Sequence, residues 1–458
     1  MSVQSLHYLS PAQQPQKLRG GDILTMGFAT TVAVWVVAYV CRMPIVQAPG
    51  KITVLLMLAM VFLGGFATGR YTTRGILGGA LTGALSGLLN ILIVGSVFSD
   101  YVKTHNPALV PAAALWVSGS VLANVVIAAI GAAIGRIKRC ECAANINWPM
   151  MFAIVLCVAT LPLITMGGLV TAFRAGLAVP DWPRSYEYNM FLLPLSMMQS
   201  PDGSKDGNFY EHAHRLMGSL VGLTSIAVAI YFTLVDRRIF VKAFVWAILT
   251  SVVIQGILGG TRVTEKSLTL AVMHGVYGQL IFASMVCLAA IAACRFKSAD
   301  KPHDAPGAST DFFLSIALVV TLTIQLILGA ILRHKEMMLL MHITFATAPI
   351  LIGLAVALRS WGIYGHLKPL RTAGLWIIAL IGLQVVLGLI SIAVRQPAGV
   401  PQSTASAFIT TAHQANGALL LALASLHMTW ALRLLKNVPM PPEAEVVEPA
   451  QTPQTTST

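Results

Sequence analysis

Four histidines occupy matching places in four expected helices, and their side chains are the best candidates for chemistry in this chain. Each lies within the outer third of a long apolar segment, and they are His214, His274, His342 and His413. A neutral imidazole is a common ligand of metal ions, including haem iron. Ionisable groups at membrane depth usually mark function, because burying them there is costly. The four histidines are therefore candidate ligands of a metal ion or a haem.

A small residue follows each of these histidines four positions later, on the same face of its helix. The pairs are His214 with Gly218, His274 with Gly278, His342 with Ala346, and His413 with Gly417. A flat macrocycle ligated by a histidine needs the neighbouring helical turn to be free of bulk, which Gly or Ala provides. The pattern therefore favours haem as the ligand.

The spacing of the histidines indicates an internal repeat of two four-helix units. The run Gln255–Gly259 recurs as Gln384–Gly388, at nearly the same separation in the chain as His214 and His342. A related run, Gln325–Gly329, lies in the first helix of the second unit. Each unit then contributes one histidine from its second helix and one from its fourth. Because these helices can face each other across a bundle, each pair can hold one iron between two imidazoles.

Two other interpretations of the histidines remain open at this stage. They could be structural residues that bond to neighbouring helices, although four repeated positions disfavour this. They could also bind zinc or copper, but such sites usually add Cys or carboxylate ligands nearby. Only the first unit carries a carboxylate close to its histidines, so a metal ion site repeated in both units is disfavoured.

The elements that must position these side chains are transmembrane helices. The chain has 458 residues, of which 56% are hydrophobic and 10% charged, and its mean hydropathy is +0.76. This composition favours a lipid bilayer over water as the solvent, and predicts an all-α polytopic membrane protein. About twelve apolar runs are long enough to span a bilayer. They begin near residues 24, 52, 75, 109, 150, 212, 241, 269, 312, 338, 372 and 407.

The chain is expected to divide into four parts. Residues 1–148 form an N-terminal membrane extension of about four helices, 149–298 a first four-helix bundle, and 299–436 a second one. Residues 437–458 are rich in Pro, Glu, Thr and Gln and predict a disordered tail. Residues 173–211 form a long segment between helices, which is typical of functional loops, and 296–311 a polar linker.

The net charge of +13 does not indicate nucleic acid, because Lys and Arg fall in small groups between apolar runs. Most of these groups lie on one side if the helices alternate, which predicts a multi-pass protein of the cytoplasmic membrane with both termini in the cytoplasm. The polar segment Met1–Gly21 lacks the apolar core of a cleavable signal. The first helix would then be its own insertion signal.

With these features in place, residues of about 150–435 resemble the haem A synthase family. The segment Phe209–Arg215 matches the E-x-x-H-R signature of that family, and Pro180-Asp181-Trp182-Pro183 resembles the C-P-D-W-P that precedes it there. The four histidines, with Gln255 and Gln384, complete the likeness. The resemblance implies two four-helix bundles related by a pseudo-twofold axis, with the active site in the first bundle and a haem b in the second.

The resemblance also implies a reaction and a set of partners. The C8 methyl of haem O would be oxidised through an alcohol to a formyl group, giving the haem A of terminal oxidases. His214 and His274 would hold the substrate haem, and His342 and His413 a haem b that passes electrons. A haem O synthase would deliver the substrate. The electron donor is not identified, and a homo-oligomer is left open.

Glu211 and Arg215 are the charged candidates of the first unit. Glu211 lies one turn before His214, where a carboxylate can move protons or stabilise a cation as the methyl is oxidised. The alternative is a charge favoured at the start of a helix by the macrodipole. Arg215 is a candidate partner of a haem propionate.

The chain departs from the family in its cysteines and its extension. Many members carry a cysteine pair in the first outer loop of this unit, but residues 173–211 contain no Cys and Val179 precedes Pro180. Cys140 and Cys142 form a C-x-C beside basic residues, and we expect two ordinary reduced thiols there. The extension contains His105 in a loop and no catalytic constellation, which favours a scaffold or partner-docking role.

Two other functions use the same features. A bis-haem b-type electron carrier, linked to quinol, would need the same four histidines but would leave its haem unaltered. A transporter would use the two units as repeats around a substrate path, but helices broken at matching places are not evident. Identifying the haem extracted from the purified protein would separate the three.

Overall fold

The computed structural model describes residues 20–104, 110–198, 206–294, 302–396 and 402–439, and within them the chain is almost entirely helical. Twelve helical segments of this described part are long and apolar enough to span a membrane, as the sequence predicts. His105 and most of the predicted tail lie outside the described residues. The long helices are α1 (Gly21–Arg42), α2 (Gly50–Tyr71), α3 (Gly75–Thr104), α4 (Val110–Gly135), α5 (Trp148–Ala172), α6 (Asp206–Val235), α7 (Ile239–Thr264), α8 (Leu268–Cys294), α9 (Ala308–Lys335), α11 (Thr347–Gly362), α12 (Lys368–Ala393) and α13 (Thr404–Leu434).

The tenth span is interrupted, which the sequence did not predict. The short helix α10 (Leu339–Phe345) ends at Ala346, where α11 begins, and the two together form one candidate span. Pro349 lies in the first turn of α11, where it has no N–H to donate to the preceding turn. The break therefore falls where the proline would weaken a continuous helix.

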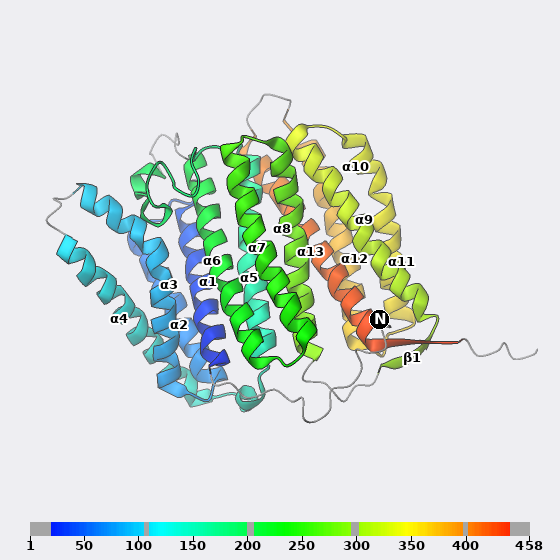
Figure 1. The fold of residues 1–458 in the computed structure, drawn as a ribbon, viewed down its shortest axis with the longest axis horizontal. Coiled ribbons are helices and arrows are strands. Elements are labelled where there is room, and N and C mark those ends of the chain that lie inside the picture. Colours follow the sequence, from blue (N-terminus) through cyan, green and yellow to red (C-terminus); the bar gives the residue numbers. More distant parts are fainter. Residues whose placement is uncertain (1–19, 105–109, 199–205, 295–301, 397–401, 440–458) are drawn as a thin grey trace, which may run out of the picture.

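The helices pack in three groups, which lie from left to right in Figure 1. Helices α5, α6, α7 and α8 contact one another in a closed ring, and α9, α10–α11, α12 and α13 form a second ring. Between the rings, α8 contacts α13, α5 contacts α13, and α8 contacts α9. If α5 is exchanged with α9, and α8 with α13, the same three contacts between the bundles are obtained. The packing therefore has the symmetry of two repeats related by a pseudo-twofold axis.

The extension of α1–α4 packs against the first bundle through α1, which contacts α5 and α6. Within it, the close approach of α2 and α4 depends on small residues, because a Cβ on Gly65 would collide with the backbone of Ala128. The indole of Trp35 donates to Asn90 Oδ1 at 3.1 Å, and Asn90 Nδ2 in turn lies 3.4 Å from Asn124 Oδ1. Small residues and buried polar bonds thus hold the extension together.

A small parallel sheet joins the linker to the start of the predicted tail. Strand β1 (His303–Pro306) pairs with β2 (Leu435–Val438), so residues 437 and 438 are ordered into a strand. Nearby, Asp311 of α9 binds Arg359 at 2.7 Å and accepts a hydrogen bond from Tyr364 at 2.6 Å. Burial and this hydrogen bond raise the pKa of Tyr364, which keeps its proton for donation. These contacts fasten the end of the second bundle opposite to the histidines.

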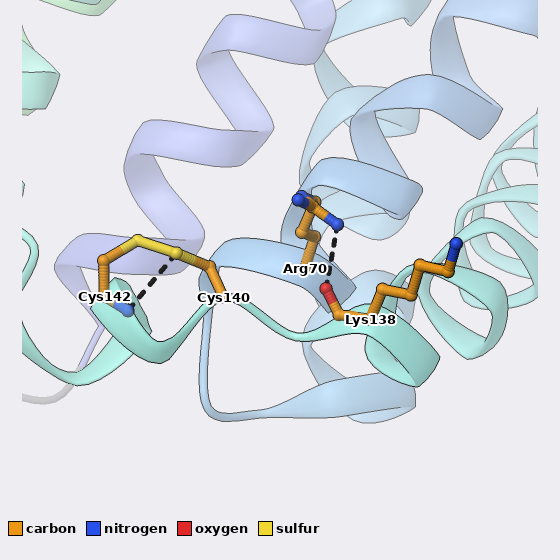
Figure 2. Close-up of a disulfide and its surroundings, with 4 residues drawn as sticks. All are labelled: Arg70, Lys138, Cys140 and Cys142. Carbon is orange, nitrogen blue, oxygen red and sulfur yellow. Dashed lines mark hydrogen bonds between the residues drawn. A yellow bond between two sulfur atoms is a disulfide. The ribbon is translucent and has the colours of Figure 1, made fainter.

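The expectation of two reduced thiols at the C-x-C is wrong, because Cys140 and Cys142 are joined by a disulfide (Figure 2). The turn between them brings their Cα atoms to 5.1 Å, within the range that a disulfide bridges. The backbone N–H of Cys140 donates to Arg70 O at 2.9 Å, and Arg70 Nη1 donates to Lys138 O at 2.9 Å. The segment is thereby attached to the end of α2.

Candidate functional site

The structure brings the four histidines together as two pairs at the same end of the two bundles. The rings of His214 (α6) and His274 (α8) have centroids 6.2 Å apart and are inclined by 79°. The rings of His342 (α10) and His413 (α13) have centroids 6.4 Å apart and are inclined by 77°. Two imidazoles bound to opposite sides of one metal, with bonds of about 2 Å, place their centroids about 6 Å apart. Both pairs therefore have the ring separation that one iron requires.

Each of these rings lies directly against a glycine of the preceding span. A Cβ built on the glycine would lie 2.8–3.2 Å from the histidine Cε1, which leaves little or no space for a side chain. The contacts are Gly167 with His214, Gly259 with His274, Gly329 with His342, and Gly388 with His413. A larger residue at any of them would displace the ring. We call each of these glycines the seat of its histidine ring, and the same contact occurs four times, once for each ring.

Hydrogen bonds fix the ring orientation in the first bundle. His214 Nδ1 lies 3.2 Å from Leu163 O, and His274 Nδ1 lies 3.1 Å from Gln255 O. A carbonyl oxygen only accepts, so each Nδ1 carries the proton and each Nε2 has the free lone pair that a metal requires. Leu163 and Gln255 both lie one helical turn before the glycine seat. The first pair is therefore already in the tautomer that binds iron.

The second pair differs at its ring nitrogens. Gln325 Nε2 donates to His342 O at 2.8 Å, as Gln255 Nε2 does to His274 O, but it also lies 3.2 Å from His342 Nδ1 and 3.4 Å from His342 Nε2. Gln384 Nε2 lies 3.3 Å from His413 Nε2. The Nδ1 of His413 has no hydrogen-bond partner among the described residues. For His413 to bind iron through Nε2, the Gln384 amide must turn away from the ring.

The small residues after the histidines have a use that the sequence did not indicate. A Cβ on Gly278 would lie 2.8 Å from Gln255 Nε2, and one on Gly417 would lie 3.3 Å from Gln384 Nε2. These glycines therefore make room for the glutamine of the neighbouring helix. The prediction that they clear a macrocycle is not tested by these contacts.

Glu211 is buried and fully engaged in hydrogen bonds. Its Oε1 accepts from Arg215 Nη2 at 2.7 Å, and its Oε2 accepts from the backbone N–H of Val179 at 3.0 Å. Its side chain is 3% exposed and that of Arg215 is 9% exposed, so this ion pair is shielded from water. Glu211 thus connects α6 to the loop that follows α5, at the residue before Pro180.

Arg215 binds this loop rather than standing free for another anion. Besides Glu211, its guanidinium donates to Val179 O at 2.9 Å, Asp181 O at 2.7 Å and Arg184 O at 3.1 Å. The sequence suggested a haem propionate as its partner. In the structure Arg215 binds the loop carbonyls and Glu211, so it holds the loop, and the haem propionate stays a prediction.

The loop itself lies at the histidine end, between α3 and α6 at the top of Figure 1, and its short helical turns Met190–Leu192 and Leu195–Met197 contact α3. Asp181 accepts hydrogen bonds from the backbone N–H groups of Tyr186 and Glu187, at 2.6 and 2.8 Å. Trp182 lies over Gly260 of α7, next to the seat of His274. Burial raises the pKa of Tyr186, whose hydroxyl donates to Ala178 O. The loop is therefore a fixed cover, held by internal bonds and by Arg215.

Three residues at this end were missed by the sequence analysis. His212, beside Glu211 on α6, is fully buried, and neither ring nitrogen has a hydrogen-bond partner among the described residues. Arg262 and Arg333 lie partly buried near the histidines and bond only to backbone carbonyls. Neither arginine belongs to a motif, so the available signal was a basic residue near the end of an apolar run.

Part of the chain matches a known protein family. Residues 150–342 match the family model described as cytochrome oxidase assembly protein, COX15-CtaA. The match covers the first bundle and the second as far as His342, and leaves the extension and His413 outside. No curated protein matches the chain significantly.

The glycine seats predict a sharp difference between two glycines of α7. Gly259→Val should displace the His274 ring and remove one of two bound haems, because its side chain needs the space that Cε1 occupies. Gly256→Val is the matched control, since a Cβ there meets no atom within 4 Å. The measurement is the haem content per protein, together with the absorption spectrum. Equal haem content in the two variants would contradict the role of the seat.

Proposed function

With residues 150–342 matched to the family of cytochrome oxidase assembly proteins, we propose that this chain is a haem A synthase, an oxidoreductase. The resemblance to that family, expected from the sequence, is confirmed over these residues. The proposed reaction is oxidation of the C8 methyl of haem O through an alcohol to a formyl group, which gives haem A for terminal oxidases. An oxygen atom from O2 or water replaces two hydrogens of the methyl, and an external oxidant takes up the electrons.

The observation that carries this proposal is the difference between two otherwise matching histidine pairs. Both pairs have the spacing that one iron needs, but only the first has a buried carboxylate one turn before its histidine. The repeat that aligns His214 with His342 places Leu339 where the first bundle has Glu211. A site with an added charged group is suited to chemistry, whereas a site without one is suited to holding a cofactor. We therefore assign the substrate haem to His214 and His274, and a haem b to His342 and His413.

When bound, the haem iron supplies the redox chemistry, and the chain supplies orientation and charge. Glu211 accepts two hydrogen bonds, from a guanidinium and from a backbone N–H, which suit an ionised carboxylate. Such a fixed negative charge stabilises positive charge that develops as the methyl is oxidised. The bonded geometry favours this role for Glu211 over proton transfer, because both of its oxygens already have donors.

The folded loop supports the reaction by excluding water. Trp182 over Gly260, and the bonds of Arg215 to the loop, cover the end of the bundle at which Glu211 lies. A covered site strengthens the electrostatic effect of Glu211 and protects reactive intermediates. Arg215 is thus a positioning residue.

We propose the cytoplasmic membrane as the location, with both termini in the cytoplasm and the histidine end on the outer side. The basic residues support this orientation, because most lie at the opposite ends of the helices. Haem O from a haem O synthase, an electron donor of unidentified class and the lipid bilayer would be the partners. The four-helix extension would be a scaffold that packs on α5 and α6 through α1.

A bis-haem b-type electron carrier, linked to quinol, is the second candidate. The close similarity of the two histidine pairs favours it, since both could hold the same haem. Such a carrier has no use for the charge of Glu211.

Replacing Glu211 separates these functions. In a host that makes haem O but lacks its own synthase, the wild type should yield extractable haem A. Glu211→Gln should still bind haem, yet yield haem O with some of the alcohol, because the variant keeps size but removes charge. Glu336→Gln is the control, since Glu336 lies at the same end with an exposed side chain, paired with Arg174. Near-normal haem A from Glu211→Gln would exclude a catalytic role, and no haem A from the wild type would favour the electron carrier.

The orientation is tested by labelling single cysteines in a background without the six natural ones. A thiol reagent confined to the outside should react with Glu265→Cys, which follows α7 at the histidine end. It should not react with Ile363→Cys, which follows α11 at the opposite end. Both residues are exposed in the structure. The reverse pattern would place the histidine pairs on the cytoplasmic side.

A further inference from the structure

Two arginines at the histidine end have no anionic partner among the described residues. Arg262, near the end of α7, donates through Nη2 to Gly176 O at 2.7 Å. Arg333, near the end of α9, donates through Nη2 to Gly168 O at 2.7 Å and through Nη1 to Thr410 O at 3.1 Å. A guanidinium has more N–H donors than these bonds use. Both side chains can therefore accept a further partner.

Four other arginines that are at least partly buried each bind a carboxylate. Arg74 binds Asp22, Arg215 binds Glu211, Arg238 binds Asp236 and Arg359 binds Asp311, at distances of 2.6–2.8 Å. An arginine at membrane depth is costly unless its charge is balanced, and carbonyl oxygens balance it only in part. Arg262 and Arg333 therefore have the donor capacity and the charge to bind an anion that is not part of the protein.

Both arginines lie beside the histidine pairs. Arg262 follows the seat of His274, Gly259, by three residues on α7, so the two lie about one turn apart on the same side of the helix. It therefore borders the first pair.

Arg333 lies between the two pairs. One of its partners, Gly168, is adjacent to the seat of His214, and the other, Thr410, is one turn before His413. The guanidinium thus bonds to both bundles. Arg262 and Arg333 form a basic cluster near the junction of the two sites.

We infer that Arg262 and Arg333 bind the carboxylates of the porphyrins held by the histidine pairs, an inference that rests on the proposed function. A porphyrin of this class carries two propionates, and a guanidinium binds a carboxylate with charge and two parallel N–H donors. Arg262 binds the porphyrin of the first site. Arg333, which lies between the two sites, binds that of the second. The basic cluster then neutralises the anionic edges of both ligands.

This arrangement also orients the substrate. In haem O the C8 methyl and one propionate are on the same pyrrole ring. When Arg262 binds that propionate, the C8 methyl lies on the same edge of the porphyrin as the guanidinium, whereas binding of the other propionate places the C5 methyl there. Carboxylate binding by Arg262 thus limits the methyl groups at this edge to these two.

The test compares binding of iron protoporphyrin with binding of its dimethyl ester, which has the same ring without the two negative charges. Full-length protein is purified without haem and titrated in detergent, with absorbance as the readout. The first site is measured in a background of His342→Ala with His413→Ala, and the second in a background of His214→Ala with His274→Ala. The quantity of interest is the ratio of the dissociation constants for ester and acid.

We expect the first site to prefer the acid form, and Arg262→Gln to reduce that preference roughly tenfold while ester affinity stays unchanged. Arg333→Gln should do the same at the second site. Charge-retaining Arg262→Lys and Arg333→Lys should recover part of the preference. Arg174→Gln is the matched control, because Arg174 is exposed at the same end and already has Glu336 at 3.6 Å.

Three outcomes would overturn the inference. The Gln variants could keep the wild-type preference, they could weaken acid and ester equally, as a structural role would, or the Lys variants could recover nothing. Failure of the proposed function is distinct, since the wild type would then yield no haem A in the host that makes haem O, whereas the ratio of the dissociation constants is measured without any conversion of the porphyrin.

Discussion

The contact between each histidine ring and a glycine of the neighbouring helix sets the geometry of both sites. Glycine lets the two helices approach until the ring lies against backbone. The centroid of the paired ring across the bundle then lies at the distance that two metal–nitrogen bonds to one iron require. A side chain at the seat would push the ring out of line. The packing of α5 on α6, α7 on α8, α9 on α10, and α12 on α13 is thus part of the site.

The two bundles share this packing, but they differ in the charged residues near the histidines and in the loop that lies over them. The first has Glu211 and Arg215 on α6, and a loop held over its end by their hydrogen bonds. The second has Leu339 in the place of Glu211 and a short helix, α10, that ends one turn after His342. Under the proposed function, the first pair is suited to reaction and the second to holding a cofactor.

Much of this could be predicted from the sequence, because the signals are periodic. The spans follow from apolar length, and the pairing of His214 with His274 follows from their repeated positions in the second and fourth helices. The glycine seats were harder to predict from the repeat. The residue four positions before Gly167 is Leu163, whereas a Gln lies four positions before each of the other three glycines. The repeat motif was visible, but its contact with the ring was not.

The remaining features depend on contacts between distant parts of the chain. Arg333 meets Gly168, and Arg215 meets the loop carbonyls, through side-chain positions that no local pattern encodes. The disulfide between Cys140 and Cys142 depends on the geometry of one turn. The β1–β2 pair joins the segment that precedes the second bundle in the chain to the segment that follows it. Composition and spacing carry no information on such contacts.

The central claim is that the chain holds two irons, each between two imidazoles. Electron paramagnetic resonance of the oxidised wild-type protein, purified with its haems, tests this together with the haem content. The account predicts two haems per chain, with low-spin signals of bis-histidine ligation and no dominant high-spin signal. A single haem per chain, or a predominantly high-spin signal, would contradict it.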